Sequence, residues 1–217
     1  MGIIQKEKIS SQVSDYIKRQ IITRKLKDGD RIVESQIARQ LGISQAPVRE
    51  ALKELEGMGM IEIRPYSGCY VLPFDETKLN QAYELRSLLE EYAANYAVTM
   101  ISSEEIDEME SLLEDMRKDA DRDDKWSLIE NDVLFHEVLV KAAKNIMLEK
   151  MWRIASVPQW SSLTILSYGD IHYFSESHAV LIECLRAHDG ERLRKELHKH
   201  FMNAADIARK TVTENGN

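Results

Sequence analysis

Two short helical patterns joined at a single glycine constrain this chain more than any other feature of its sequence. The first pattern places three apolar residues at helical spacing: Ile37, Ala38 and Leu41. Gly42 follows and can adopt the left-handed conformation that ends a helix. Ser44 then stands where a helix N-cap is expected, and Pro47 lies in the first turn of the second pattern. That second pattern has one apolar face made by Val48, Ala51, Leu52 and Leu55.

A small hairpin is predicted directly after these two helices. Gly57 and Gly59 end the second helical pattern, and Met60 to Arg64 and Cys69 to Leu72 alternate like short strands. The intervening Pro65-Tyr66-Ser67-Gly68 is a typical turn sequence. An upstream helix, with Val13, Ile17 and Ile21 on one face, would complete a three-helix core. This order is the outline of a winged helix-turn-helix, which places its second helix in the DNA major groove.

The side chains expected to contact DNA lie on two surfaces of this module. The second helix exposes Ser44, Gln45, Ala46, Arg49 and Lys53. Arginine can donate two hydrogen bonds to guanine, and glutamine can pair with adenine. The turn of the wing places Arg64, Tyr66, Ser67 and Gly68 within reach of phosphate or the minor groove. The alternative is a small α+β module whose Arg49 is only a solvated surface charge.

Charge is distributed unevenly along the chain. The net charge is −8, but residues 1–75 carry 12 Lys and Arg against 10 Asp and Glu, whereas residues 76–217 carry 17 against 27. The acidic excess therefore lies outside the candidate DNA-binding region, and phosphate contacts depend on local charge. No apolar run approaches the roughly 20 residues of a membrane span, and no signal peptide is visible. We expect a cytoplasmic protein with no membrane partner, in which Cys69 and Cys184 are reduced.

The remainder of the chain is helical in pattern and is predicted to form a second domain. Pro73 and the polar run Asp75-Glu76-Thr77 mark the boundary, so we expect a DNA-binding domain over 1–74 and a helical domain over 75–217. Six helices are predicted near 76–100, 103–120, 123–143, 145–167, 171–188 and 190–213. Ser102 and Glu105 resemble a capping box. The expected fold is mainly α: a winged helix-turn-helix followed by an antiparallel all-helical bundle.

Four polar residues interrupt the apolar faces of three of these predicted helices. Asp132 and His136 stand at i and i+4 on the third helix, His178 on the fifth and His200 on the sixth. Burying a polar group without a partner costs about 1–3 kcal/mol, and a charge costs more. One divalent metal ion would satisfy all four. Imidazole suits zinc, nickel, iron or copper, and the carboxylate is compatible with these and also with manganese. Alternatively, protein partners satisfy each group. We expect ordinary surface or loop roles for His172, His188 and His198.

The first third of the chain resembles the GntR family of bacterial transcription regulators. The resemblance covers about residues 6–73 and rests on Gly29-Asp30-Arg31-Ile32-Val33-Glu34, Leu41-Gly42-Ile43-Ser44, Pro47-Val48-Arg49-Glu50-Ala51-Leu52, and Gly68 with Val71 in the wing. It implies a homodimer that binds double-stranded operator DNA. The family commonly has arginine at the position of Gln45, and some members have arginine at Ser35. The operator is therefore expected to differ from the family's usual one.

The helical domain resembles the FCD-type effector domain of FadR-like GntR regulators. The similar segments are Asp132-Val133-Leu134-Phe135-His136, Asn145, Ser177-His178, and Asp189 with His200. Members often bind a metal through one aspartate and three histidines, which implies Asp132, His136, His178 and His200 as ligands. Zinc or nickel is expected first, with iron or manganese as alternatives. The founding fatty-acyl-CoA-responsive member differs in this region, so no lipid ligand is implied.

The same resemblance implies a small organic acid as effector. Arg86, in a motif over residues 84–90 that is similar to the FCD pattern, is placed to pair with its carboxylate. The alternative for Arg86 is a surface salt bridge with Glu90 at i+4. Five further residues are expected to line the pocket or to pack the bundle, with packing favoured for the aromatics: Trp152, Arg153, Trp160, Tyr168 and Tyr173.

Taken together, these features predict a ligand-responsive, sequence-specific DNA-binding regulator rather than an enzyme. Two alternatives stay open. In one, the protein is a metal sensor for which the ion itself is the signal. In the other, it is a metal-dependent hydrolase or lyase that uses a metal-bound water.

Overall fold

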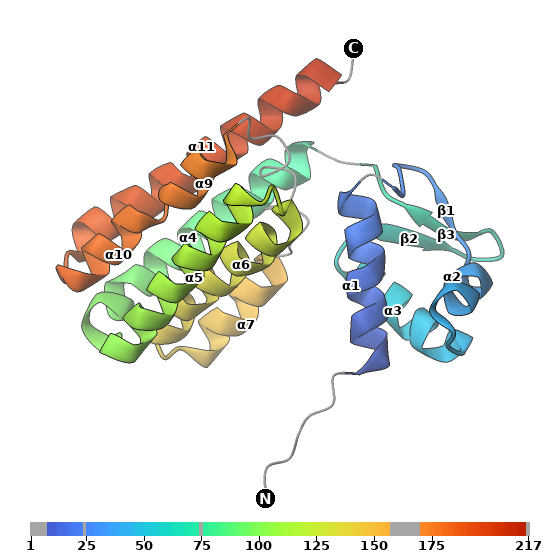
Figure 1. Cartoon of the computed structure of the whole chain (residues 1–217), viewed down its shortest axis with the longest axis horizontal. Coiled ribbons are helices and arrows are strands. Elements are labelled where there is room, and N and C mark those ends of the chain that lie inside the picture. Colours follow the sequence, from blue (N-terminus) through green and yellow to red (C-terminus); the bar gives the residue numbers. More distant parts are fainter. Residues whose placement is uncertain (1–7, 24, 74–75, 157–169, 216–217) are drawn as a thin grey trace, which may run out of the picture. The chain divides into compact units, whose positions relative to one another are not determined.

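A computed structural model describes residues 8–23, 25–73, 76–156 and 170–215 (Figure 1). The chain forms two compact units, Met1–Phe74 and Asp75–Asn217. Most described residues are helical, and the only sheet among them is small, so the predicted mainly α class is confirmed. Within the described part of the chain, no helix is both long enough and apolar enough to span a membrane.

The first unit is a winged helix-turn-helix. Its described elements are α1 (Ile9–Ile22), β1 (Arg31–Ile32), α2 (Glu34–Leu41), α3 (Gln45–Gly57), β2 (Ile61–Arg64) and β3 (Gly68–Val71). The apolar faces predicted from helical spacing are buried together: Val13, Ile17, Ile21, Val48, Ala51, Leu52 and Leu55. The sheet has the antiparallel order β1-β3-β2, with Ile63 opposite Cys69. The predicted hairpin is confirmed. The sequence did not predict β1, because two residues are too few to show alternation.

The turn between α2 and α3 forms as its sequence predicts, with one exception. Gly42 has φ 67°, the left-handed conformation that closes α2, and the Ile43 N–H donates to Ala38 O over 3.0 Å. Ser44 has the extended backbone of an N-cap residue but makes no capping hydrogen bond through its side chain. The predicted N-cap position is therefore confirmed, but the expected hydrogen bond through the hydroxyl is not formed. The hydroxyl stays exposed at the start of α3.

The second unit is a helical bundle. Its described helices are α4 (Glu76–Met100), α5 (Ser103–Asp121), α6 (Lys125–Ala142), α7 (Ile146–Ala155), α9 (Ile171–Glu176), α10 (Ala179–Arg186) and α11 (Gly190–Asn215). Helix α4 packs against α11, α6 and α7 (Figure 1). Arg194 of α11 contacts Asn95, whereas His198, one turn later, contacts Glu91, one turn earlier. The two helices are therefore antiparallel. The predicted capping box of Ser102 and Glu105 opens α5.

Two predicted helices end earlier than the sequence pattern indicates. The helix expected over 145–167 ends at Ala155, and the residues from 157 to 169 lie outside the described ranges. The helix expected over 171–188 is divided into α9 and α10 at Ser177 and His178. At this break, the Ser177 hydroxyl donates to Phe174 O over 2.6 Å. Local side-chain hydrogen bonds of this kind compete with the backbone hydrogen bonds of a helix. His178 therefore lies in a turn, whereas the other three predicted metal ligands lie within helices.

Candidate metal centre and nucleic-acid interface

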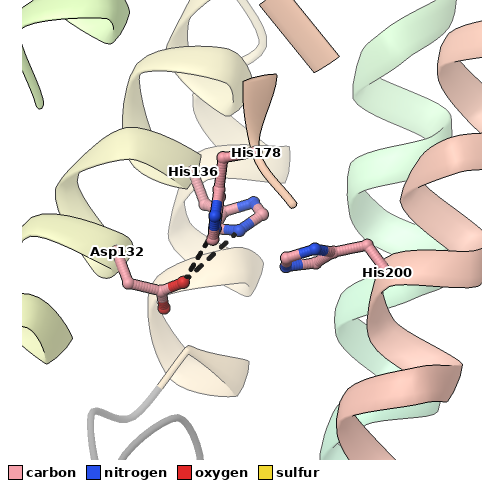
Figure 2. Close-up of side chains that lie close together, drawn as sticks. All are labelled: Asp132, His136, His178 and His200. Atoms are coloured by element: carbon pink, nitrogen blue, oxygen red, sulfur yellow. Dashed lines mark hydrogen bonds and ion pairs between the residues drawn. The ribbon is translucent and has the colours of Figure 1, made fainter. Parts of the chain in front are cut away.

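The four predicted metal ligands converge inside the helical unit. Asp132 and His136 project from successive turns of α6, His178 comes from the turn between α9 and α10, and His200 approaches from α11 on the opposite side (Figure 2). Their ligand atoms all lie within 4.8 Å of one another. Asp132, His136 and His178 are buried, and His200 is half-buried. We call these four residues the Asp/His cluster.

Distances within the Asp/His cluster show which of its polar atoms have a hydrogen-bond partner in the protein. His178 Nε2 lies 3.1 Å from Asp132 Oδ1, within hydrogen-bonding distance. His136 Nε2 lies 3.8 Å from the same oxygen and, although fully buried, has no hydrogen-bond partner. A buried nitrogen without a partner is unfavourable by about 1–3 kcal/mol. Protein partners therefore leave one nitrogen of the cluster unsatisfied, and the arrangement is compatible with a divalent cation.

The Nδ1 atom of each histidine in the cluster has a hydrogen-bonding partner outside the cluster. His136 Nδ1 lies 2.6 Å from Glu90 Oε2, and His200 Nδ1 lies 3.3 Å from Ser177 Oγ. His178 Nδ1 faces two backbone carbonyl oxygens, at 3.2 and 3.1 Å. All three rings thereby direct Nε2 toward the centre of the cluster. Metal-binding histidines characteristically have such outer partners, which fix ring orientation and tautomer.

The protonation states of the cluster also suit a metal. Burial disfavours the charged form of Asp132, but the hydrogen bond to His178 and the nearby His136 outweigh it, so the pKa of Asp132 lies well below its usual range. For His200, burial first and then His178 and His136 hold the pKa well below its usual value. An ionised carboxylate and a neutral imidazole are the forms that bind divalent ions. A proton between His178 Nε2 and Asp132 would be replaced by the ion.

Arg86 lies next to the cluster, deep inside the unit. Its side chain is 1% exposed, and Nη2 lies 3.2 Å from Glu90 Oε1. The pair with Glu90 exists, but the alternative of a surface salt bridge is wrong, because Glu90 is fully buried too. A cavity of about 10 Å³ adjoins the cluster and is lined by Tyr83, Arg86, Asp132, Phe174, His200, Phe201 and Ala204. A space of this size holds about one water molecule.

Glu90 is the site residue that sequence reasoning missed. Its carboxylate accepts hydrogen bonds from Trp152 Nε1 at 2.6 Å and from Arg86, and it contacts His136. Burial favours the neutral acid, but His136 and Arg86 outweigh it, so the pKa of Glu90 lies below its usual range. The signal in the sequence was the i+4 spacing from Arg86, which does not distinguish a buried pair from an exposed one.

The remaining residues expected near the site lie outside the cluster. Trp152 is buried in a small apolar core with Leu148, where it packs as expected. Arg153 forms exposed ion pairs with Glu137 and Glu149. Tyr173 is 58% exposed, and Trp160 and Tyr168 fall outside the described residues. Three other histidines are exposed and absent from the cluster: His172, His188 and His198.

The predicted DNA-contacting residues lie on the outer face of α3 and on the wing. All are exposed except Gly68, which is half-buried: Ser44, Gln45, Ala46, Arg49, Lys53, Arg64, Tyr66, Ser67 and Gly68. Arg49 Nε lies 2.7 Å from Glu34 Oε2, and its Nη2 lies 3.3 Å from Gln45 Oε1. The Arg49 guanidinium is therefore already engaged by Glu34 and Gln45 in the absence of DNA. In the wing, Arg64 stacks over the Tyr70 ring at 4.7 Å.

Arg31 is an additional basic residue beside the wing. Gly68 has φ 125°, and a Cβ at this position would lie 2.9 Å from Arg31 Nε. The guanidinium therefore rests directly over the Gly68 backbone. The signal for this placement was the Gly29–Glu34 motif, which contains Arg31. A bulkier residue at 68 would displace the arginine from the wing.

Comparison with protein families gives two matches, one in each unit. Residues 9–71 match the family described as bacterial regulatory proteins, gntR family, and residues 81–203 match the FCD domain. A probable D-xylose utilization operon transcriptional repressor of Paenarthrobacter nicotinovorans is 32% identical over 88% of this chain and 85% of its own. The gluconate operon transcriptional repressor of Bacillus subtilis (strain 168) is 25% identical over 94% of this chain and 86% of its own.

Solved structures share the fold. The structure of E. coli McbR/YncC has a TM-score of 0.79 and 22% identity, covering 94% of this chain and 98% of that one. The metal-free FCD domain of TM0439 has a TM-score of 0.54 and 21% identity, covering 65% of this chain and 98% of that domain. At these identities the likeness concerns the fold alone.

Proposed function

The chain belongs to the GntR family of bacterial regulatory proteins and carries an FCD domain, and from this premise we propose that it is a metal-containing regulator controlled by a small organic acid. The family and the curated relatives are transcription regulators rather than enzymes, so the hydrolase or lyase alternative is not retained. The chain is thus a ligand-responsive DNA-binding regulator. The metal, the acid and the homodimer are the proposed parts.

The first unit is the proposed operator-binding domain, and Arg49 is its proposed base-reading residue. Arg49 and Gln45 are exposed on adjacent turns of α3, the element that a winged helix-turn-helix inserts into the major groove. Arg64, Ser67 and the Gly68 backbone are proposed to contact the DNA backbone or the minor groove. A palindromic operator would be bound by two copies of the chain, in the cytoplasm.

Asp132, His136, His178 and His200 are the proposed ligands of one divalent ion, with zinc or nickel expected first. The observation that carries this proposal is His136 Nε2, which is buried, lacks a partner and faces three other ligand atoms. FCD domains are associated with metals, and one structural relative is named as a metal-free FCD domain. When bound, the ion would supply a positive charge that attracts an anionic ligand.

Arg86 is the proposed partner of the effector's carboxylate. It lines the cavity beside the cluster together with Asp132 and His200. The cavity is too small for an organic acid of several heavy atoms, so binding would have to displace its aromatic wall and would also compete with Glu90 for the guanidinium. Ligand binding would thus favour a different conformation of the helical unit and change the affinity for DNA.

Operator binding measured with and without metal tests this proposal against the metal-sensor alternative. Fluorescence anisotropy on an operator selected from random DNA would follow the metal-free protein, the zinc-loaded protein, and the zinc-loaded protein titrated with carboxylic acids. Gluconate is the first acid to try, because one relative is named for the gluconate operon. The expected result is a change in affinity only when an acid is added to the loaded protein. A change that follows zinc alone would favour the metal sensor.

A matched pair of variants keeps this test specific to the cluster. His178→Ala removes a proposed ligand, whereas His198→Ala removes an exposed histidine that contacts Glu91 on the surface. We expect the acid response to disappear in His178→Ala and to persist in His198→Ala. An unchanged response in both variants would contradict a role for the cluster in sensing.

A further inference from the structure

Glu90 is a buried carboxylate on α4 that contacts the Asp/His cluster on α6 and also contacts α7. It is fully buried on α4, and both of its oxygens are engaged. Oε2 lies 2.6 Å from His136 Nδ1 of α6. Oε1 accepts from Trp152 Nε1 of α7 at 2.6 Å and from Arg86 Nη2 at 3.2 Å. Glu90 therefore contacts a proposed metal ligand and the proposed effector partner without being a ligand itself.

We infer that Glu90 is a positioning residue for the metal centre. Glu90 holds His136 in the tautomer that leaves the lone pair of Nε2 free to bind the ion. This inference rests on the proposed metal site and deepens it. It states that Glu90, which lies outside the cluster, determines which ring nitrogen of His136 carries the proton.

The tautomer follows from the groups that face His136. A carboxylate has acceptor sites only, so its 2.6 Å contact requires the imidazole proton on Nδ1. A neutral ring with its proton on Nδ1 keeps a lone pair on Nε2. That nitrogen is buried with no hydrogen-bond partner and lies among the other ligand atoms. Both the ring's orientation and its protonation thus depend on Glu90.

The substitution Glu90→Gln would reverse this arrangement without changing the side chain's shape. Glutamine offers one oxygen and one NH2 group, while Trp152 Nε1 and the Arg86 guanidinium are donors only. Because both donors face the same position, the amide oxygen should turn toward them and the NH2 group toward His136 Nδ1. His136 would then accept at Nδ1 and carry its proton on Nε2. The ion would have to displace that proton, so we expect a 10- to 100-fold loss of metal affinity.

The tautomer also distinguishes positioning from a merely structural role. If Glu90 only stabilised the bundle by pairing with Arg86, its replacement would lower stability and leave the protonation of His136 unchanged. The nitrogen that carries the proton can be read from long-range ¹H–¹⁵N correlation spectra of the metal-free full chain labelled at histidine. A His136→Gln variant identifies the signals of this ring.

The experiment combines these spectra with zinc affinity measured by competition with a chromophoric chelator. We expect the proton on Nδ1 in the unsubstituted protein and on Nε2 in Glu90→Gln, with zinc bound 10- to 100-fold more weakly by the variant. Glu91→Gln is the matched control, because Glu91 contacts Ser87 and His198 instead of the cluster. It should change neither the tautomer nor the affinity.

Two results would overturn the inference. One is a proton on Nε2 of His136 in the unsubstituted protein, which is informative even if Glu90→Gln fails to fold. The other is equal zinc affinity in the unsubstituted protein and Glu90→Gln. If the unsubstituted protein binds no zinc, the proposed metal site itself fails and the inference falls with it. That titration precedes any comparison of variants, so the two failures are distinguishable.

Discussion

Replacement of Arg86 tests how strongly its buried ion pair with Glu90 stabilises the helical unit. Its side chain is 1% exposed and pairs with a fully buried Glu90 across 3.2 Å. Removing one partner of a buried ion pair costs about 3–5 kcal/mol, because the other charge stays buried without compensation. Glu90 would keep the hydrogen bond from Trp152 and its contact with His136. We therefore expect Arg86→Met to lower the free energy of unfolding by about 3 kcal/mol, the lower end of this range.

Chemical and thermal unfolding of the metal-free full chain measure this loss. For a chain of this length, about 3 kcal/mol corresponds to a fall of roughly 6–12 °C in the unfolding midpoint. Arg153→Met is the matched control, since Arg153 is 56% exposed and pairs with Glu137 and Glu149 at the surface. Its loss should be about 0–1 kcal/mol. Equal losses in the two variants would refute the reasoning that burial makes Arg86 different.

Three other predictions concern DNA binding, the wing and pH. Arg49→Ala should weaken operator binding by about 1–3 kcal/mol and relax sequence preference at one base pair, whereas Lys53→Ala should weaken binding to all sequences and flatten its salt dependence, as measured by anisotropy over a salt series. Gly68→Ala should lower the stability of the first unit by about 1–3 kcal/mol in thermal unfolding, because φ 125° is strained for any residue with a Cβ; an unchanged midpoint would contradict this. Finally, the folded-state pKa of His200 lies well below its ordinary value of 6.5, so below pH 6.5 the unfolded chain binds a proton that the folded chain does not. The metal-free protein should therefore lose stability as pH falls from 7 to 5, and His200→Asn should reduce that slope.

The sequence predicted the DNA-binding unit well, because its signals are local. The buried faces of α1 and α3 follow directly from helical spacing, and the glycine at 42 marks the turn. The side-chain cap at Ser44 was less predictable than the capping box of Ser102 and Glu105. Ser44 occupies the expected backbone position, yet its hydroxyl does not form the capping bond. Residue type limits where a cap can be, but the side-chain rotamer decides whether the bond is made.

In the helical unit, spacing alone did not reveal where the chain breaks. Ser177 has φ −60° and ψ −14°, and His178 has φ −85° and ψ −22°. Both conformations are near helical, so the apolar period continues through the turn and hides it. The break nevertheless brings the Ser177 hydroxyl to 3.3 Å from His200 Nδ1. The spacing of apolar residues is read over several helical turns, so it does not reveal a break confined to two residues.

The candidate site was predictable in its ligands but not in their support. Asp132, His136, His178 and His200 were each predicted from a polar position on an apolar helix face, and the resemblance to the FCD domain pointed to the same four residues. Glu90 lies 46 residues from His136 and 62 from Trp152 in the chain. Only the packing of α4 against α6 and α7 brings these groups together. The role of a buried carboxylate depends on such distant partners.

The number of metal ions bound per chain tests the central claim most directly. Elemental analysis would follow dialysis of the full chain against zinc and then against metal-free buffer, alongside His178→Ala and His198→Ala. We predict one ion per chain in the unsubstituted protein and in His198→Ala, and far less than one in His178→Ala. No retained ion in the unsubstituted protein, or equal retention in all three, would contradict a metal centre at Asp132, His136, His178 and His200.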